Sequence, residues 1–129
     1  MRLIRSVAHP LLGAVFVTGG LDVLRDPAPR ARLAAPVVEW VASRVPVAPS
    51  DPVEAVRLNA MLQVGAGGML AAGIMPRLAA AVLAGSTALT TMGGHRFWEV
   101  GDEKQRGMQR TQFLKNAAIL GGLLAVASS

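Results

Sequence analysis

The sequence contains no cysteine and no tyrosine, and only 4% of its 129 residues are aromatic. Without cysteine, this chain has no disulfide, no thiol chemistry of its own and no Cys-ligated metal or cluster. Histidine is almost as scarce, with two residues, and no grouping of His with Asp or Glu has metal-ligand spacing. The sequence therefore predicts no metal site and no resident cofactor.

Charge is also scarce, at 16% of residues against 52% that are hydrophobic. A soluble domain of this size needs a mixed, charged surface, which so few charges do not supply. The net charge of +5 raises the question of nucleic-acid binding. The arginines, however, flank apolar segments and form no dense basic stripe, so we expect a membrane protein that does not bind nucleic acid.

Four apolar segments follow one another and predict membrane-spanning helices at about 7–24, 53–75, 78–92 and 113–127. Asp51, Pro52 and Glu54 form a helix-start pattern before the second segment. Asp102 and Gln105 form a similar pattern before the last helix. We therefore predict an all-α fold, a single membrane domain over residues 1–129 built as a bundle of four transmembrane helices.

The first segment resembles a signal peptide, since two arginines precede an apolar run. No clear small-residue cleavage site follows, so we expect it to be retained as the first span. Between the first two spans, five prolines interrupt the chain, and residues 37–45 are too short and too charged to cross a bilayer. They predict a short interfacial helix with Trp40 at the level of the lipid headgroups.

Small residues recur at helical spacing in the predicted spans. Lipid provides no hydrophobic drive between helices, so membrane bundles rely on close packing through such residues. We expect helix contacts along three stripes: Ala80, Ala84 and Ala88; Ala117, Gly121 and Ala125; and Gly68 with Ala72.

Polar residues gather near the span ends that face the two longer connections. Asn59 and Gln63 belong to this set. One interpretation is a structural polar cap of ion pairs and hydrogen bonds formed by Asp22, Arg57, Glu99, Lys115 and Asn116. The alternative is a site for a quinone or another ligand, whose candidate residues are His95, Arg96, Trp98, Glu99 and Arg57. Paired haem ligation is not expected, because the second histidine, His9, lies near the opposite end of the bundle.

Basic residues predict the orientation in the membrane. Three lie on the side of the two termini, and eight lie on the side of the longer connections: Arg2, Arg5 and Arg77 against Arg25, Arg30, Arg32, Arg44, Arg96, Lys104, Arg106 and Arg110. The positive-inside rule then favours longer connections in the cytoplasm and both termini outside.

The chain resembles the DoxX family of small four-span membrane proteins, in an actinobacterial type. The resemblance rests on GGLDVLRDP in the first span, AGGMLAAGIMPRLAA in the middle and, most specifically, GHRFWE followed by QFLKNAAILGGLLA. It implies a multi-pass protein of the bacterial inner membrane, associated with redox complexes, the respiratory chain or oxidative stress.

The resemblance also suggests what the protein does. We expect an accessory subunit of a membrane redox or respiratory complex, not an enzyme on its own, whose partners are the lipid bilayer and other membrane subunits or copies of itself. Two alternatives stay open: a quinone-reactive oxidoreductase component, and a membrane chaperone or small-solute carrier. Among these alternatives, the one possible cofactor is a quinone.

Overall fold

The structure is a computed structural model that describes residues 2–94, 97–99 and 101–129. These residues form helices and no strands, so the all-α fold class is confirmed. The helices are α1 (Arg2–Arg25), α2 (Ala28–Arg44), α3 (Pro52–Ala72), α4 (Pro76–Gly94), the 3₁₀ turn η1 (Phe97–Glu99) and α5 (Glu103–Ser128).

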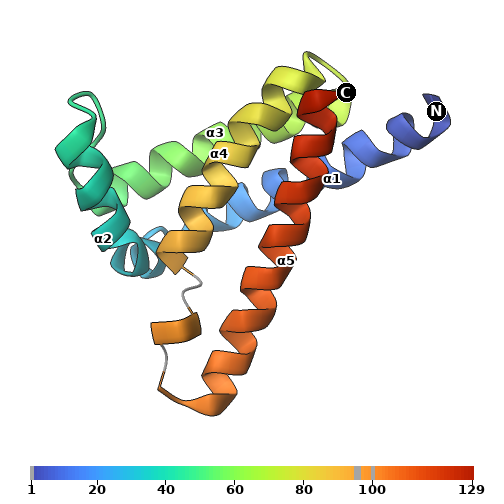
Figure 1. The fold of residues 1–129 in the computed structure, drawn as a ribbon. Coiled ribbons are helices and arrows are strands. Elements are labelled where there is room, and N and C mark those ends of the chain that lie inside the picture. The colour runs from blue at the N-terminus through green and yellow to red at the C-terminus, as the bar shows by residue number, and fades with distance from the viewer. Residues whose placement is uncertain (1, 95–96, 100) are drawn as a thin grey trace.

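The long helices form two closely packed pairs. α1 packs along α3, and α4 packs along α5 (Figure 1). A tight turn joins the pairs between α3 and α4, with Gly73 in the left-handed region at φ 74° and Met75 at φ 44°. Arg77, at the start of α4, donates from Nε to the carbonyl oxygen of Ala127 at 3.4 Å, so the end of α5 lies beside this turn.

Glycines allow the backbones of α1 and α3 to touch. A Cβ placed on Gly13 would clash with the carbonyl oxygen of Gly67 and lie 2.8 Å from the Cβ of Ala71. Two helical turns further along α1, a Cβ on Gly20 would lie 2.7 Å from the carbonyl oxygen of Ala60. Side chains at these positions would force the helices apart, which explains why small residues occupy them.

The predicted small-residue stripes have mixed outcomes. Ala80 and Ala84 are buried in the core, as expected, whereas Ala88 of the same stripe is exposed. Ala117, Gly121 and Ala125 are exposed, as are Gly68 and Ala72, so these two stripes make no close contact within the chain. The sequence did not reveal which small residues pack between α1 and α3, because small residues also occur at helical spacing on the exposed faces of the helices.

The buried core is small, and the outside of the bundle is apolar. The buried cluster consists of Phe16, Leu70, Ala79, Ala80, Leu83, Ala84 and Leu123. Large hydrophobic side chains are exposed on every long helix; examples are Leu11 on α1, Met61 on α3, Val82 on α4 and Leu124 on α5. Among the described residues, α1 is the one helix that is long and apolar enough by itself to cross a membrane.

The helix α2 is longer than the sequence indicated. It covers Ala28–Arg44, whereas a short helix over 37–45 was predicted, and Pro36 lies inside it. The prediction was wrong because it treated every proline as a helix break. Pro29 lies in the first turn, where a missing N–H costs little, and Pro36 removes only one backbone hydrogen bond.

Helix starts were predicted with variable accuracy. Asp51 is the N-cap of α3, and its carboxylate accepts from the backbone N–H of Val53 at 3.1 Å. Asp102 occupies the N-cap position of α5 but makes no side-chain capping bond. α1 begins at Arg2 instead of near residue 7, so Pro10 lies in its interior.

Candidate ligand pocket

A pocket of about 670 Å³ lies at the end of the bundle that faces the two longer connections. All five α-helices and the segment after α2 contribute to its lining. This volume is within the range of small-molecule sites. The pocket is therefore the candidate functional site.

One wall of the pocket is apolar and comes largely from α2. Leu33, Val37, Val38 and Val41 recur at helical spacing on the face of α2 that lines the pocket. α2 contacts α3 and α4, so it closes one side of this end of the bundle. Val15, Val23 and Val56 from α1 and α3 extend the apolar lining.

The α3 side of the pocket carries two amide side chains fixed by a buried serine. Asn59 and Gln63 are four residues apart, so they share one face of the helix. Ser86 on α4, which is buried, donates from Oγ to Oδ1 of Asn59 at 2.7 Å and accepts from Nε2 of Gln63 at 3.0 Å. The hydroxyl thus holds both amides at the pocket wall.

The orientation of Asn59 leaves a donor at the pocket. Its oxygen is engaged by Ser86, and its Nδ2 donates to no other described residue. No buried side-chain nitrogen or oxygen of the described residues lacks a partner. The Nδ2 group must therefore keep access to solvent or to a ligand, and Asn59 is part of the pocket lining.

A third amide comes from α5. Asn116 donates from Nδ2 to Oγ1 of Thr91 at 3.1 Å, and Thr91 is buried in α4. Thr87 and Thr90, which also line the pocket, donate their own hydroxyl hydrogens to carbonyl oxygens within α4. The polar wall is thus assembled from α3, α4 and α5, and buried hydroxyls of α4 hold these three amides.

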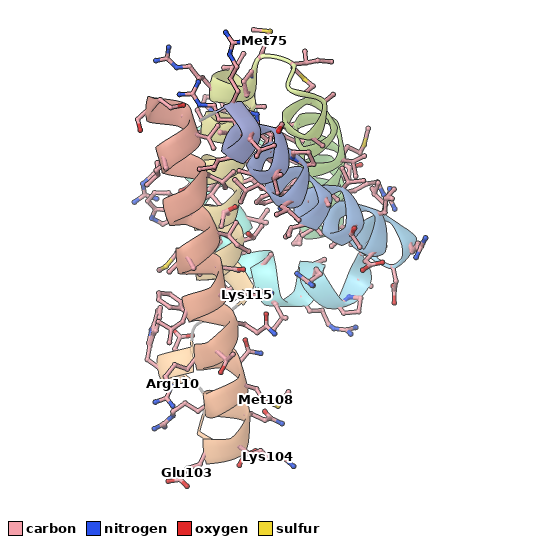
Figure 2. All side chains as sticks on the ribbon, turned by 90° about the vertical axis from the view of Figure 1, so that its right-hand side faces the viewer. Met75, Glu103, Lys104, Met108, Arg110 and Lys115 are labelled. Carbon is pink, nitrogen blue, oxygen red and sulfur yellow. The ribbon has the colours of Figure 1, made fainter. Side chains whose placement is uncertain are left out.

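The charged residues of the lining are all cations. Arg30 comes from α2 and Lys115 from α5, whereas neither Asp nor Glu lines the pocket in the part of the chain that the structure describes. Lys115 makes no ion pair with a described residue. Figure 2 shows Lys115 at the level where α5 reaches the other helices, with Glu103 and Lys104 on the part of α5 that extends past them.

Some of the residues predicted to form a polar cap do not meet. Asp22 pairs with Arg25 at 3.4 Å on the exposed surface of α1, and Arg57 is exposed and does not line the pocket. The expected ion pairs of Arg57 or Lys115 with Asp22 or Glu99 are not formed between these described side chains. Of the five cap residues, Lys115 and Asn116 line the pocket.

The predicted quinone candidates that the structure describes are not part of the pocket lining. Trp98 in η1 packs edge-on against Phe113 of α5, with ring centroids 5.7 Å apart and an interplanar angle of 81°. Neither Trp98 nor Glu99 lines the pocket. His95 and Arg96 lie outside the described residues.

Sequence reasoning missed most of the lining. Asn59 and Gln63 were recognised as polar residues of the second span, but their spacing by four was not used to define a site. The apolar face of α2 was missed because this helix was expected to begin at residue 37, which excludes Arg30 and Leu33. The pattern that could have found it is the recurrence of Leu33, Val37, Val38 and Val41.

A family model described as DoxX matches residues 6–96. The chain belongs to the DoxX family. The match covers most of α1 and all of α2, α3 and α4, which supply the apolar wall and about half of the polar wall, the rest coming from α5. No curated protein and no solved structure matches this DoxX chain. Family membership and the apolar helix α1 together identify a membrane protein.

Proposed function

We propose that this DoxX protein is a small multi-pass subunit of a redox or respiratory assembly in the bacterial inner membrane, and that it binds a lipid-soluble quinone in the pocket. The observation that carries this proposal is the composition of the pocket, with an apolar wall from α2 facing amides, hydroxyls and a lysine from α3, α4 and α5.

Four membrane crossings are supported by length and by the outer surface. At about 1.5 Å per residue, α1, α3 and α4 are roughly 36, 32 and 28 Å long, close to the ~30 Å of a bilayer core. In α5 the apolar part begins near Phe113, after first turns that carry Glu103, Lys104 and Arg106, and it extends about 24 Å. Their exposed apolar side chains would be unfavourable in water and are favourable in lipid. The hydroxyls of Ser86, Thr87 and Thr91 lower the hydropathy of α4, yet all three are buried and hydrogen-bonded within the chain.

A quinone fits the chemistry of the lining. Its ring and isoprenoid tail are apolar and match the valine-rich wall, while its carbonyl oxygens accept hydrogen bonds. The Nδ2 group of Asn59 and the ammonium group of Lys115 are donors available for such oxygens. Buried partners fix Asn59, Gln63 and Asn116, so a ligand would not have to order these amides on binding.

The proposed role as a subunit is supported by the absence of cysteine and by an exposed, uncharged face of α5. The chain has no cysteine, so any thiol or cluster chemistry that exchanges electrons with the quinone must come from a partner. The face of α5 with Leu114, Ala117, Gly121 and Leu124 is exposed and uncharged, as expected for a helix that packs against another membrane subunit.

Binding of a short-chain ubiquinone or menaquinone to the purified protein in nanodiscs tests the quinone. Quenching of Trp40 and Trp98 fluorescence gives a saturation curve. We expect Asn59→Leu to weaken binding about tenfold, equivalent to the loss of one buried hydrogen bond. Gln105→Leu, the same kind of change at an exposed α5 position outside the pocket, should leave binding unchanged.

Absence of saturable binding by the unmodified protein would exclude the quinone. Recovery of the protein without any redox enzyme, after mild detergent extraction and mass spectrometry of its copurifying partners, would exclude the assembly.

A further inference from the structure

The cations of the pocket have no acidic counterpart in its lining. Lys115 and Arg30 come from opposite sides, α5 and α2, and no Asp or Glu is found among the described lining residues. Asp22, an acid expected to pair with Lys115, pairs instead with Arg25 on the outer surface of α1. The pocket therefore presents positive charge that the described part of the protein does not neutralise.

The described residues that line the pocket with Lys115 also carry no negative charge. The polar groups that α4 and α5 add to the lining besides Lys115 are neutral amides and hydroxyls, among them those of Gln112, Asn116 and Thr90. The side chains of Lys115 and Arg30 are exposed and can reach an anion at the pocket. Such an anion gains more beside the apolar wall than in open water, because the local dielectric constant is lower there. Neutral donors such as Asn59 Nδ2 stabilise the same anion through charge-assisted hydrogen bonds.

We propose that the pocket selects a ligand whose oxygen-bearing headgroup is anionic, and that Lys115, with Arg30, is the determinant of this selectivity. This inference rests on the proposed quinone function and adds to it a preference for quinones that carry an ionised hydroxyl or another anionic ring substituent. Lys115 is accordingly a ligand-binding residue and not a member of a structural ion pair.

Two matched probes separate charge from shape: an alkylated hydroxynaphthoquinone, which is an anion at neutral pH, and its methoxy analogue, which is neutral. Binding of each is measured in phosphatidylcholine nanodiscs by tryptophan quenching. We expect the anionic probe to bind about tenfold more tightly than the neutral probe, since an ion pair and a charge-assisted hydrogen bond are added. Raising the salt concentration should reduce this ratio.

The variants assign the preference to named residues. Lys115→Met should bring the two affinities close together by weakening only the anionic probe, whereas Lys115→Arg should retain most of the preference. Arg30→Met should also lower the preference for the anionic probe. The matched controls are Lys104→Met on α5 and Arg32→Met on α2, which remove a charge outside the pocket and should leave the ratio unchanged.

The outcomes distinguish the two proposals. Failure of both probes to bind would overturn the quinone function and, with it, this inference. Equal binding of both probes, or a preference that persists in the Lys115→Met and Arg30→Met variants, would overturn the inference alone. Loss of the preference in nanodiscs that contain phosphatidylglycerol would also overturn it, because a lipid headgroup would then be the anion that Lys115 binds.

Discussion

Gly13 of α1 lies against Gly67 of α3 with no room for a Cβ at either position. A Cβ on Gly67 would lie 2.9 Å from both the carbonyl oxygen of Gly13 and the Cβ of Phe16. This contact brings the backbones of the first helix pair together, beside the buried side chain of Phe16. The pocket lies at one end of this pair, so the contact also sets the separation of its α1 and α3 walls.

Gly13→Ala tests the close approach of α1 and α3. The added methyl group meets backbone atoms that cannot move aside independently, so we expect a loss of about 1–3 kcal/mol in the free energy of unfolding. The thermal unfolding midpoint in detergent measures it. The matched control is Gly65→Ala on α3, where a Cβ meets nothing within 4 Å. A Gly13→Ala variant as stable as this control would contradict the contact.

Ser86→Ala tests the hydroxyl that holds the two pocket amides. The change removes hydrogen bonds to Asn59 and Gln63, which link α3 to α4. We expect a destabilisation of about 1 kcal/mol, together with weaker ligand binding because the amides lose their fixed orientation. Thr111→Ala, which removes an exposed hydroxyl bonded within its own helix, should affect neither quantity. Equal effects of the two changes would argue against the bridging role of Ser86.

Asn116 and Thr91 are suited to a double-mutant cycle. Their side chains form a direct bond of 3.1 Å between α5 and α4. We expect Asn116→Leu and Thr91→Val each to lower stability, and the double variant to lose less than the sum, with a coupling of about 0.6 kcal/mol as is average for membrane proteins. Chemical unfolding in mixed micelles provides the four free energies. Strict additivity would mean that the bond contributes nothing.

Leu83 is one of the fully buried residues of the core. Its side chain is fully buried in α4, so Leu83→Ala should cost about 2–5 kcal/mol through lost packing and the cavity left behind. Leu124 on α5 is 54% exposed, and Leu124→Ala should change the stability of the isolated protein little. Thermal unfolding compares the two. Similar losses would show that the exposed face of α5 is packed in the purified protein, for example against a second copy.

Local sequence patterns predicted those features of the helices well that depend on neighbouring residues in one segment, such as a helix start. Asp51 and Pro52 located the start of α3 because capping depends on neighbouring residues. Pro36 misled the prediction of α2, since the cost of one lost hydrogen bond is offset by the packing of α2 against α3 and α4.

The site was harder to predict because it depends on which helices become neighbours. Nothing local distinguishes the packed Gly13 and Gly67 from the exposed Gly121 and Ala125. Likewise, Lys115 and Glu99 lie on the same side of the predicted membrane, yet Lys115 lines the pocket and Glu99 does not. Charge complementarity in the sequence suggested a pair, but rotation about the helix axis decides which side chains meet.

The packing of α1 against α3 also has a consequence for synthesis. α1 enters the bilayer before its partner exists, because the ribosome must first make α2 and the connection that follows it. During that interval α1 must remain stable in lipid as a solitary helix, and it is the described helix whose length and composition allow this. α3 carries Glu54 and Arg57 and arrives when the glycine surface of α1 is already available. In the proposed multi-pass arrangement, the helix that can stand alone in the membrane is thus also the first of the described helices to be made.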